Sequence, residues 1–178
     1  MQVAFKLGVK YREGFMKNRY IGRTFIMPGQ RTRKRSVKQK LNPIEIEFRD
    51  KRVFLVDDSI VRGHTSKNIV KMVRDCGANK VFLASASPPI RHQNVYGIDM
   101  PATKELIGYN RSIRGIKKYI KADELIYQDL EDLTRSASIG NPKIKEFEDS
   151  VFTGKYRVGN ITEEFLKNLE QTRSSLPK

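Results

Sequence analysis

The sequence predicts an α/β fold built on a parallel β-sheet, and three consecutive patterns carry this prediction. Residues 53–56 (VFLV) form an apolar run with β-branched residues, bounded by charged residues, which is typical of a strand buried on both faces of a parallel sheet. Residues 66–76 predict a helix, because apolar side chains recur on one face: Ile69, Met72, Val73 and Cys76. Residues 81–84 (VFLA) form a second apolar strand after Gly77, a natural helix stop. Together they make a βαβ unit.

Length and composition indicate one domain with a single core. The chain has 178 residues, of which 38% are hydrophobic. It contains no 18-residue apolar run that would span a membrane, and its first residues lack the apolar stretch of a secretion signal, so we expect a cytoplasmic protein. With Cys76 as the single cysteine, an intrachain disulfide and an all-cysteine metal site are excluded.

Before the βαβ unit, the sequence predicts an extended segment followed by a basic loop. Residues 20–27 (YIGRTFIM) are rich in β-branched and aromatic residues and end at a Pro-Gly pair, as a short strand would. Residues 29–43 are strongly basic and almost devoid of apolar side chains apart from Val37 and Leu41, which are spaced as on one face of a short helix. We expect this segment to be mobile, with the helix forming only in some states.

After the βαβ unit, the elements are less regular. Residues 87–91 hold two prolines and predict a loop, residues 95–98 a short extended piece, and residues 103–109 one or two helical turns. Residues 125–127 predict a further strand, followed by a helix through Leu130 and Leu133.

From Arg135 onward, scattered glycines and a proline predict an appended tail that ends in a helix. Residues 162–172 form an amphipathic pattern with Phe165, Leu166 and Leu169 on the apolar face. We expect this helix to dock elsewhere on the protein.

Positive charge is concentrated near the N-terminus. The chain carries 35 Lys and Arg against 20 Asp and Glu, a net charge of +15, and no acidic residue lies between Glu13 and Glu45. Such a stretch attracts phosphate groups. A solvated surface, a nucleic-acid interface and a site for a small, multiply phosphorylated substrate would all account for it, and composition alone does not separate them.

Two adjacent carboxylates follow the first predicted strand. Asp57 and Asp58 stand where that strand meets the turn before the helix, which is the edge where open α/β sheets bind ligands. Residues 61–66 then combine a glycine, hydroxyl side chains and the first amides of a helix, as in a cradle for a terminal phosphate. The pattern is neither a Walker A loop nor a dinucleotide-binding glycine motif.

These residues carry a resemblance to a known family. VFLVDDSIVRGHTS resembles the 5-phosphoribosyl 1-diphosphate (PRPP) binding motif of type I phosphoribosyltransferases. The flanking sequence is similar to the bacterial form of glutamine PRPP amidotransferase, or amidophosphoribosyltransferase, over nearly the whole chain. The segments that carry this similarity are GFMKNRYIGRTFIMPGQRTRKRSVKQKLNP, EFRDKRVFLVDDSIVRG, NVYGIDMP, IYQDLEDL and, in the tail, FEDSVFTGKY.

The resemblance implies a fold and a reaction. The fold is a type I phosphoribosyltransferase-like parallel sheet flanked by helices and incomplete at its N-terminal side, with a helical C-terminal tail. Residues 1–134 correspond to the C-terminal part of the phosphoribosyltransferase domain, with residues 17–43 as its flexible basic loop, and residues 135–178 to a C-terminal extension. The reaction is the committed step of de novo purine nucleotide biosynthesis, in which ammonia displaces diphosphate from PRPP to give 5-phosphoribosylamine.

The resemblance also implies site residues. Asp57 and Asp58 would lie over the ribose hydroxyls and hold Mg²⁺, directly or through water. The flexible loop would close over PRPP, with its closed-state contacts coming from Lys17, Tyr20, Arg23 and Lys40. The 5-phosphate would be held by Ser59, Ile60, Val61, Arg62, Gly63, His64, Thr65 and Ser66. His64 departs from the family, which usually has Thr there, and we expect it to weaken phosphate binding.

Further partners follow from the family. The full family enzyme begins with a glutaminase domain whose nucleophile is an N-terminal cysteine, and this chain begins Met-Gln. We therefore expect ammonia from solution or from a glutaminase portion upstream or on a partner chain, with purine nucleotides as feedback inhibitors and a homo-oligomer in the full enzyme. The alternative is a non-catalytic sensor of PRPP or nucleotides with the same fold, and a nucleic-acid binder is disfavoured.

Overall fold

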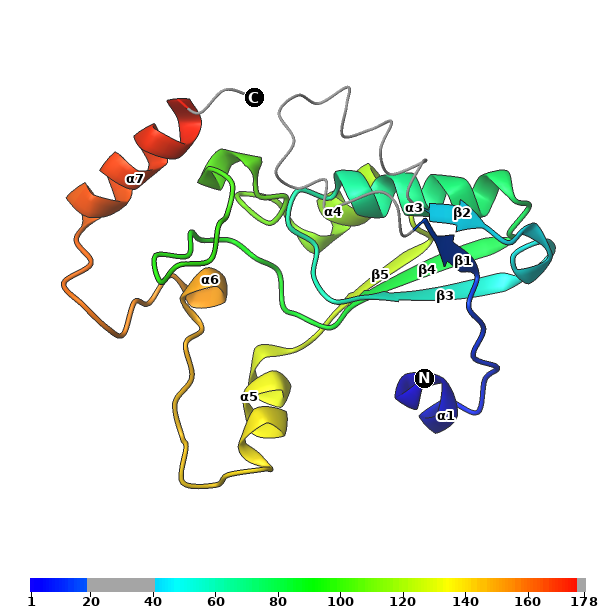
Figure 1. Ribbon diagram of the computed structural model, residues 1–178, viewed down its shortest axis with the longest axis horizontal. Helices are drawn as coiled ribbons and strands as arrows, with labels where there is room; N and C mark the ends of the chain where they lie inside the picture. Colours follow the sequence, from blue (N-terminus) through cyan, green and yellow to red (C-terminus); the bar gives the residue numbers. More distant parts are fainter. Residues whose placement is uncertain (19–40, 176–178) are drawn as a thin grey trace.

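A three-stranded parallel sheet lies at the centre of the computed structural model, which describes residues 1–18 and 41–175 (Figure 1). The strands are β3 (Arg52–Asp57), β4 (Lys80–Ser85) and β5 (Glu124–Tyr127), in the order β3-β4-β5. The helix α3 (His64–Asp75) joins the first two, and α4 (Ile113–Ile120) precedes the third. The predicted βαβ unit and parallel sheet are confirmed, with each element one or two residues longer than expected.

Two helices cover one face of this sheet and form the main core. Val70 and Val73 of α3 and Ile116 and Ile120 of α4 are all fully buried, and they pack against alternate residues of the strands, including Val81. Figure 1 shows both helices on the same side of the sheet. The apolar face of α3 therefore packs on the sheet, as its residue spacing predicted. Gly77 (φ 86°) follows the end of the helix, as expected.

The opposite face of the sheet is more open. Val56 of β3 and Ile126 of β5 are 55% and 51% exposed. The expectation that residues 53–56 are buried on both faces is therefore wrong for Val56. The reason is that α3 and α4 pack on the face that carries Val53 and Leu55, and Val56 points the other way along the pleat.

A short antiparallel ladder precedes the sheet. Strand β1 (Phe15–Lys17) pairs with β2 (Leu41–Pro43), and Phe15 packs against the buried ring of Phe48 at 5.1 Å between centroids. Neither strand was predicted, and Leu41, assigned to a basic loop and a short helix, is instead in a strand. The predicted strand at 20–27 and residues 29–40 of the predicted loop lie outside the described residues. The other N-terminal elements are α1 (Gln2–Lys6) and a 3₁₀ turn, η2 (Glu45–Glu47).

Between β4 and β5 the chain is mostly irregular. Residues 87–91 form a loop, as predicted, and a 3₁₀ turn, η3 (Thr103–Glu105), replaces the predicted helical turns. The extended piece predicted at 95–98 is wrong: the amides of Tyr96 and Ile98 both donate to the side chain of Asn94, which turns the backbone there. Helix α4, capped by the Ser112 side chain, was not predicted.

Up to residue 175, where the described chain ends, three helices follow β5. Helix α5 (Leu130–Ser138) begins at the predicted place, where the Asp129 side chain caps it, and Arg135 lies within it. Helices α6 (Ser150–Thr153) and α7 (Glu163–Ser175) follow. Helix α7 docks on another part of the same chain, the irregular segment after β4 (Figure 1). Of the three residues on the predicted apolar face, Phe165 is 45% exposed, whereas Leu166 and Leu169 are partly buried.

Among these described helices, none has the length and apolar content needed to cross a lipid bilayer.

Candidate functional site

The carboxyl ends of the three strands meet at one edge of the sheet. Asp57, the last residue of β3, is in register with Ser85 of β4, and Ser85 is in register with Tyr127 of β5. Open parallel sheets bind ligands at this edge, because the loops that leave the strands gather there. The sequence-predicted residues 57–66 leave β3 at this point, so the structure keeps them together as one turn into α3.

The carboxylate pair at this edge is poorly neutralised. The amide of Asp58 donates to Asp57 Oδ1 at 3.1 Å, and Ser59 Oγ donates to Asp58 Oδ1 at 3.0 Å. Burial raises the pKa of Asp57, the negative charge of Asp58 raises it further, and the Asp58 amide acts in the opposite direction. Within residues 1–18 and 41–175, neither carboxylate forms an ion pair.

This donor set fits Mg²⁺ bound together with a phosphorylated ligand. Mg²⁺ prefers oxygen ligands and is commonly held by one or two carboxylates, several waters and the phosphates of a substrate. In the part of the chain that the structure describes, no group of three or more Asp, Glu, His or Cys side chains converges as a metal cage would require. Asp57 and Asp58 are therefore the described residues that would hold such an ion.

Residues 59–66, hereafter the anion loop, lead from the carboxylates into α3. Ile60 is 1% exposed and anchors the loop in the core. Gly63 precedes α3 with φ 73°, and a Cβ there would collide with Ile107 Cδ1, so glycine is required by both conformation and space. In the first turn of α3, the amides of Thr65 and Ser66 have no acceptor within the helix, and Gly63 offers no capping side chain, so these two donors can face an anion.

Two basic side chains surround Tyr119, which contacts His64 at the start of α3. Tyr119 Oη lies 2.7 Å from His64 Nδ1. Lys67 Nζ and Arg111 Cζ lie 4.4 and 5.4 Å from the centroid of the Tyr119 ring. His64 and Thr65 are exposed and Ser66 is buried.

Tyr119 and Arg111 were missed from the sequence. A usable signal was the spacing of Ile113, Ile116 and Ile120 after Ser112, which is typical of a short capped helix.

Two contacts hold the anion loop from the segment before α4. Arg62 Nε donates to Glu105 Oε2 at 2.9 Å in a half-buried ion pair. The Ile107 amide donates to the Val61 carbonyl at 2.8 Å. Arg62 Nε is therefore engaged by Glu105, and the phosphate contact that the resemblance implies for Arg62 stays a prediction.

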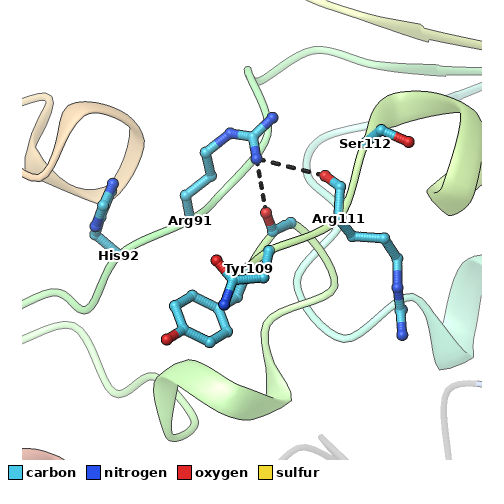
Figure 2. Close-up of a pocket in the computed structure, with 7 residues that line it drawn as sticks. Arg91, His92, Tyr109, Arg111 and Ser112 are labelled. Carbon is cyan, nitrogen blue, oxygen red and sulfur yellow. Dashed lines mark hydrogen bonds between the residues drawn. The ribbon is translucent and has the colours of Figure 1, made fainter.

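A pocket of about 400 Å³ is lined by Arg91, His92 and residues 108–112, and Figure 2 shows these residues. Arg91 Nη1 donates to the carbonyls of Gly108 and Arg111 at 2.8 and 3.5 Å, and the Arg111 side chain points away from Arg91. Burial, and then the charge of Arg91, lower the pKa of His92 beside it.

At the sheet edge, burial raises the pKa of Tyr127 to about 12.

The residues assigned to the flexible loop are only partly described. Lys17 is an exposed residue at the end of β1, in register with Leu41 of β2. The ladder thus brings the chain on either side of residues 18–40 to one place. Tyr20, Arg23 and Lys40 lie outside the described residues.

The sequence matches no protein-family model, but curated proteins match it along its whole length. It is 56% identical over 178 residues to an amidophosphoribosyltransferase of Pseudomonas aeruginosa, covering 100% of this chain and 36% of that protein. The corresponding values are 53% over 174 residues for Escherichia coli K12, covering 98% and 34%, and 52% over 176 residues for Saccharomyces cerevisiae, covering 99% and 34%.

The chain belongs to the amidophosphoribosyltransferase family. It spans about a third of the length of these relatives and matches their C-terminal part.

Solved structures of the amidophosphoribosyltransferase family have the same fold. The glutamine PRPP amidotransferase of B. subtilis, complexed with ADP and GMP, superimposes with a TM-score of 0.74 at 38% identity, covering 94% of this chain and 37% of that one. A structure described as the allosteric regulatory enzyme of purine biosynthesis gives a TM-score of 0.74 at 37% identity, covering 99% and 38%. The predicted phosphoribosyltransferase-like α/β fold is confirmed.

Proposed function

We propose that this chain forms the PRPP-binding, C-terminal part of an amidophosphoribosyltransferase, which displaces diphosphate from PRPP with ammonia to give 5-phosphoribosylamine. This is the committed step of de novo purine nucleotide biosynthesis. Family membership supports the proposal, and the chain's own geometry supports the location of the site.

The observation that carries the proposal is the carboxyl end of β3. There, Asp57 and Asp58 lack a cationic partner among the described residues, and they stand directly before a glycine-initiated helix in which the amides of Thr65 and Ser66 have no acceptor within the helix. A ligand with both a cation and a phosphate group satisfies both features. PRPP bound with Mg²⁺ is such a ligand.

In the proposed complex, each part of the site has a separate task. Asp57 and Asp58 accept hydrogen bonds from the ribose hydroxyls and hold Mg²⁺, whose charge lowers the cost of placing two carboxylates side by side. Mg²⁺, when bound, neutralises the diphosphate leaving group. The amides and hydroxyls of the anion loop hold the 5-phosphate, with Lys67 and Arg111 adding positive charge nearby.

The reaction itself is a substitution at C1 of the ribose. The nitrogen lone pair of ammonia forms the new bond to C1 as the bond from C1 to the diphosphate oxygen breaks. Diphosphate leaves with that electron pair, and the nitrogen then loses a proton. C1 is electron-poor during this exchange, so water must be excluded. We assign Lys17, Tyr20, Arg23 and Lys40 to the contacts that enclose PRPP, following the family resemblance.

The remaining partners are proposed from the family. The B. subtilis relative was solved with ADP and GMP, and we propose that purine nucleotides also bind and inhibit the protein that contains this chain. We further propose a homo-oligomer in the cytoplasm, supplied with ammonia by a glutaminase portion upstream or on a partner chain.

Formation of phosphoribosylamine tests the proposed activity. The chain, alone and mixed with the N-terminal part of the Pseudomonas aeruginosa relative, is incubated with PRPP, Mg²⁺ and ammonia, and diphosphate release is measured together with the amine. Mg²⁺-dependent turnover by the mixture is expected, with Asp58→Asn as the inactive control. PRPP binding without turnover in the mixture would favour a sensor. Duplex nucleic-acid binding that PRPP does not displace would contradict the proposal.

A further inference from the structure

The C-terminal helices hold a long segment that has no helix or strand of its own. Residues 86–102, between β4 and η3, are irregular throughout. Backbone amides and carbonyls in such a segment must find their partners elsewhere. Helix α6 supplies one acceptor for two of them, because the amides of Arg91 and His92 donate to the Val151 carbonyl at 2.9 and 3.0 Å. Figure 2 shows Arg91 and His92 side by side on this segment.

Helix α7 forms hydrogen bonds with the same segment through two charged side chains. Arg173 Nη2 donates to the Asn94 carbonyl at 3.0 Å, and its Nη1 donates to Gln93 Oε1 at 3.2 Å. Glu170 Oε2 accepts from the Thr103 amide at 2.8 Å. Gln93 and Asn94 are 6% and 3% exposed, and the three charge-assisted hydrogen bonds are partly buried. They connect positions that are more than sixty residues apart in the sequence.

The other side of the segment supports the anion loop. Val61 of that loop packs in a small apolar cluster with Ile90, Met100 and Leu106, to which α6 contributes Val151 and Phe152. Glu105, the last residue of η3, pairs with Arg62, and just beyond η3 the Ile107 amide donates to the Val61 carbonyl. The segment therefore lies between the C-terminal helices and the loop that presents amides to the ligand.

We infer that Arg173 and Glu170 are positioning residues for the anion loop, acting through residues 93–107. This inference rests on the proposed PRPP site. A loop that binds an anion through backbone amides loses affinity when it must be ordered on binding, because the ordering entropy opposes association. The two α7 side chains keep the supporting segment, and hence the loop, in the binding geometry before ligand arrives. Neither touches PRPP.

Substitution of Arg173 tests this inference, with Lys167 as a matched control. Lys167 lies on the exposed side of the same helix, so Lys167→Ala removes the same charge without removing the contacts to Gln93 and Asn94. PRPP affinity in Mg²⁺ is measured by calorimetry on the full chain, at a temperature well below unfolding of every variant. We expect Arg173→Ala to weaken binding about five- to tenfold, Arg173→Lys to restore part of it, and Lys167→Ala to stay within about twofold.

Hydrogen exchange of the ligand-free chain gives a second readout, which does not depend on PRPP. Arg173→Ala is expected to speed amide exchange both at residues 93–103 and at residues 60–66, and Lys167→Ala at neither. Faster exchange confined to residues 93–103, with PRPP affinity unchanged, would overturn the inference and leave Arg173 a purely structural residue. If the unaltered chain fails to bind PRPP while exchange still rises at both places, the proposed function fails and the positioning role stands.

Discussion

Asp123, at the amino end of the sheet, and Asp57, at the carboxyl end, have opposite surroundings. Asp123 Oδ2 accepts from the Val81 amide and from Arg74 Nη2, both at 2.7 Å, and these hydrogen bonds lower its pKa. Asp57 is beside Asp58, and its pKa is raised by burial and by that neighbouring charge. The fold satisfies one carboxylate, and we propose that the other serves a ligand.

This difference supports placing the proposed site at the carboxyl end of the sheet. A satisfied carboxylate stabilises the fold and has little left to offer a cation. A carboxylate pair that the fold leaves without a cation costs stability, and such a cost is typical of binding sites. Substitutions at the two ends should therefore separate binding from stability.

The largest expected effect is on binding, at the carboxyl end. Asp57→Asn and Asp58→Asn each remove a charge that would contact Mg²⁺ or a ribose hydroxyl, worth about 1.5–3 kcal/mol, so PRPP affinity should fall about 10- to 100-fold. Calorimetry in Mg²⁺ measures this. Asp75→Asn, on the exposed side of α3 next to Lys71, is the matched control for lost charge. An equal loss in that control would contradict the assignment.

The next effect is on stability, at the amino end. Asp123→Ala leaves the amide of Val81, a fully buried residue, without an acceptor, and the free energy of unfolding should fall by about 1–3 kcal/mol. Urea denaturation measures it, and PRPP affinity should be unchanged. Asp57→Asn should show the reverse, with no loss of stability. A large stability loss for Asp57→Asn would break the comparison.

Glycines at the two ends of α3 extend the same comparison. Gly63 and Gly77 both have positive φ, so alanine at either costs about 1–2 kcal/mol in unfolding free energy. Only at Gly63 does the new Cβ collide, with Ile107, whereas at Gly77 its nearest neighbour is 3.6 Å away. Gly63→Ala should therefore also weaken PRPP binding, and Gly77→Ala should not. Equal affinities would show that the geometry of Gly63 is not used for binding.

The contributions of Asp57 and Asp123 to the free energy of unfolding should change with pH in opposite directions. Folding raises the pKa of Asp57 above its ordinary value of 3.8, so the native state binds this proton more tightly than the unfolded state. The stability that this proton contributes is present below pH 3.8 and is lost as pH rises through the raised pKa. Asp57→Asn should remove this loss and gain stability at neutral pH. The pKa of Asp123 is lowered, so its stabilisation is present above 3.8 and is lost as pH falls through the lowered pKa. The deficit of Asp123→Ala should shrink in acid, as denaturation curves across pH would show.

The smallest expected effect is at His64. Thr in this position would place a hydroxyl at the start of α3 and release Tyr119 Oη from His64 Nδ1. We expect His64→Thr to tighten PRPP binding by one neutral hydrogen bond, about 0.5–1.5 kcal/mol, or up to about tenfold. Tyr119→Phe serves as the control for loss of the hydrogen bond alone. Weaker binding by His64→Thr would show that His64 itself contacts the phosphate.

Sequence patterns predicted the βαβ unit and the position of Asp57 and Asp58, because both depend on residues close together in the chain. They did not predict Tyr119 beside His64, or Arg111 beside Tyr119, since α4 is short and its place is set by packing against α3. They also missed the shape of residues 93–103, because this segment has no periodic pattern and takes its form from Glu170 and Arg173, far along the chain. The ladder of β1 and β2 was missed because each strand has only three residues.

Ligand mapping by NMR tests the central claim most directly. PRPP is titrated with Mg²⁺ into the isotope-labelled chain, and amide shifts are followed at both ends of the sheet. We expect Mg²⁺-dependent shifts concentrated at residues 57–66, with the amide signals of residues 79–81 and 121–124 unmoved. Shifts concentrated at the amino end, or none at saturating PRPP, would contradict it.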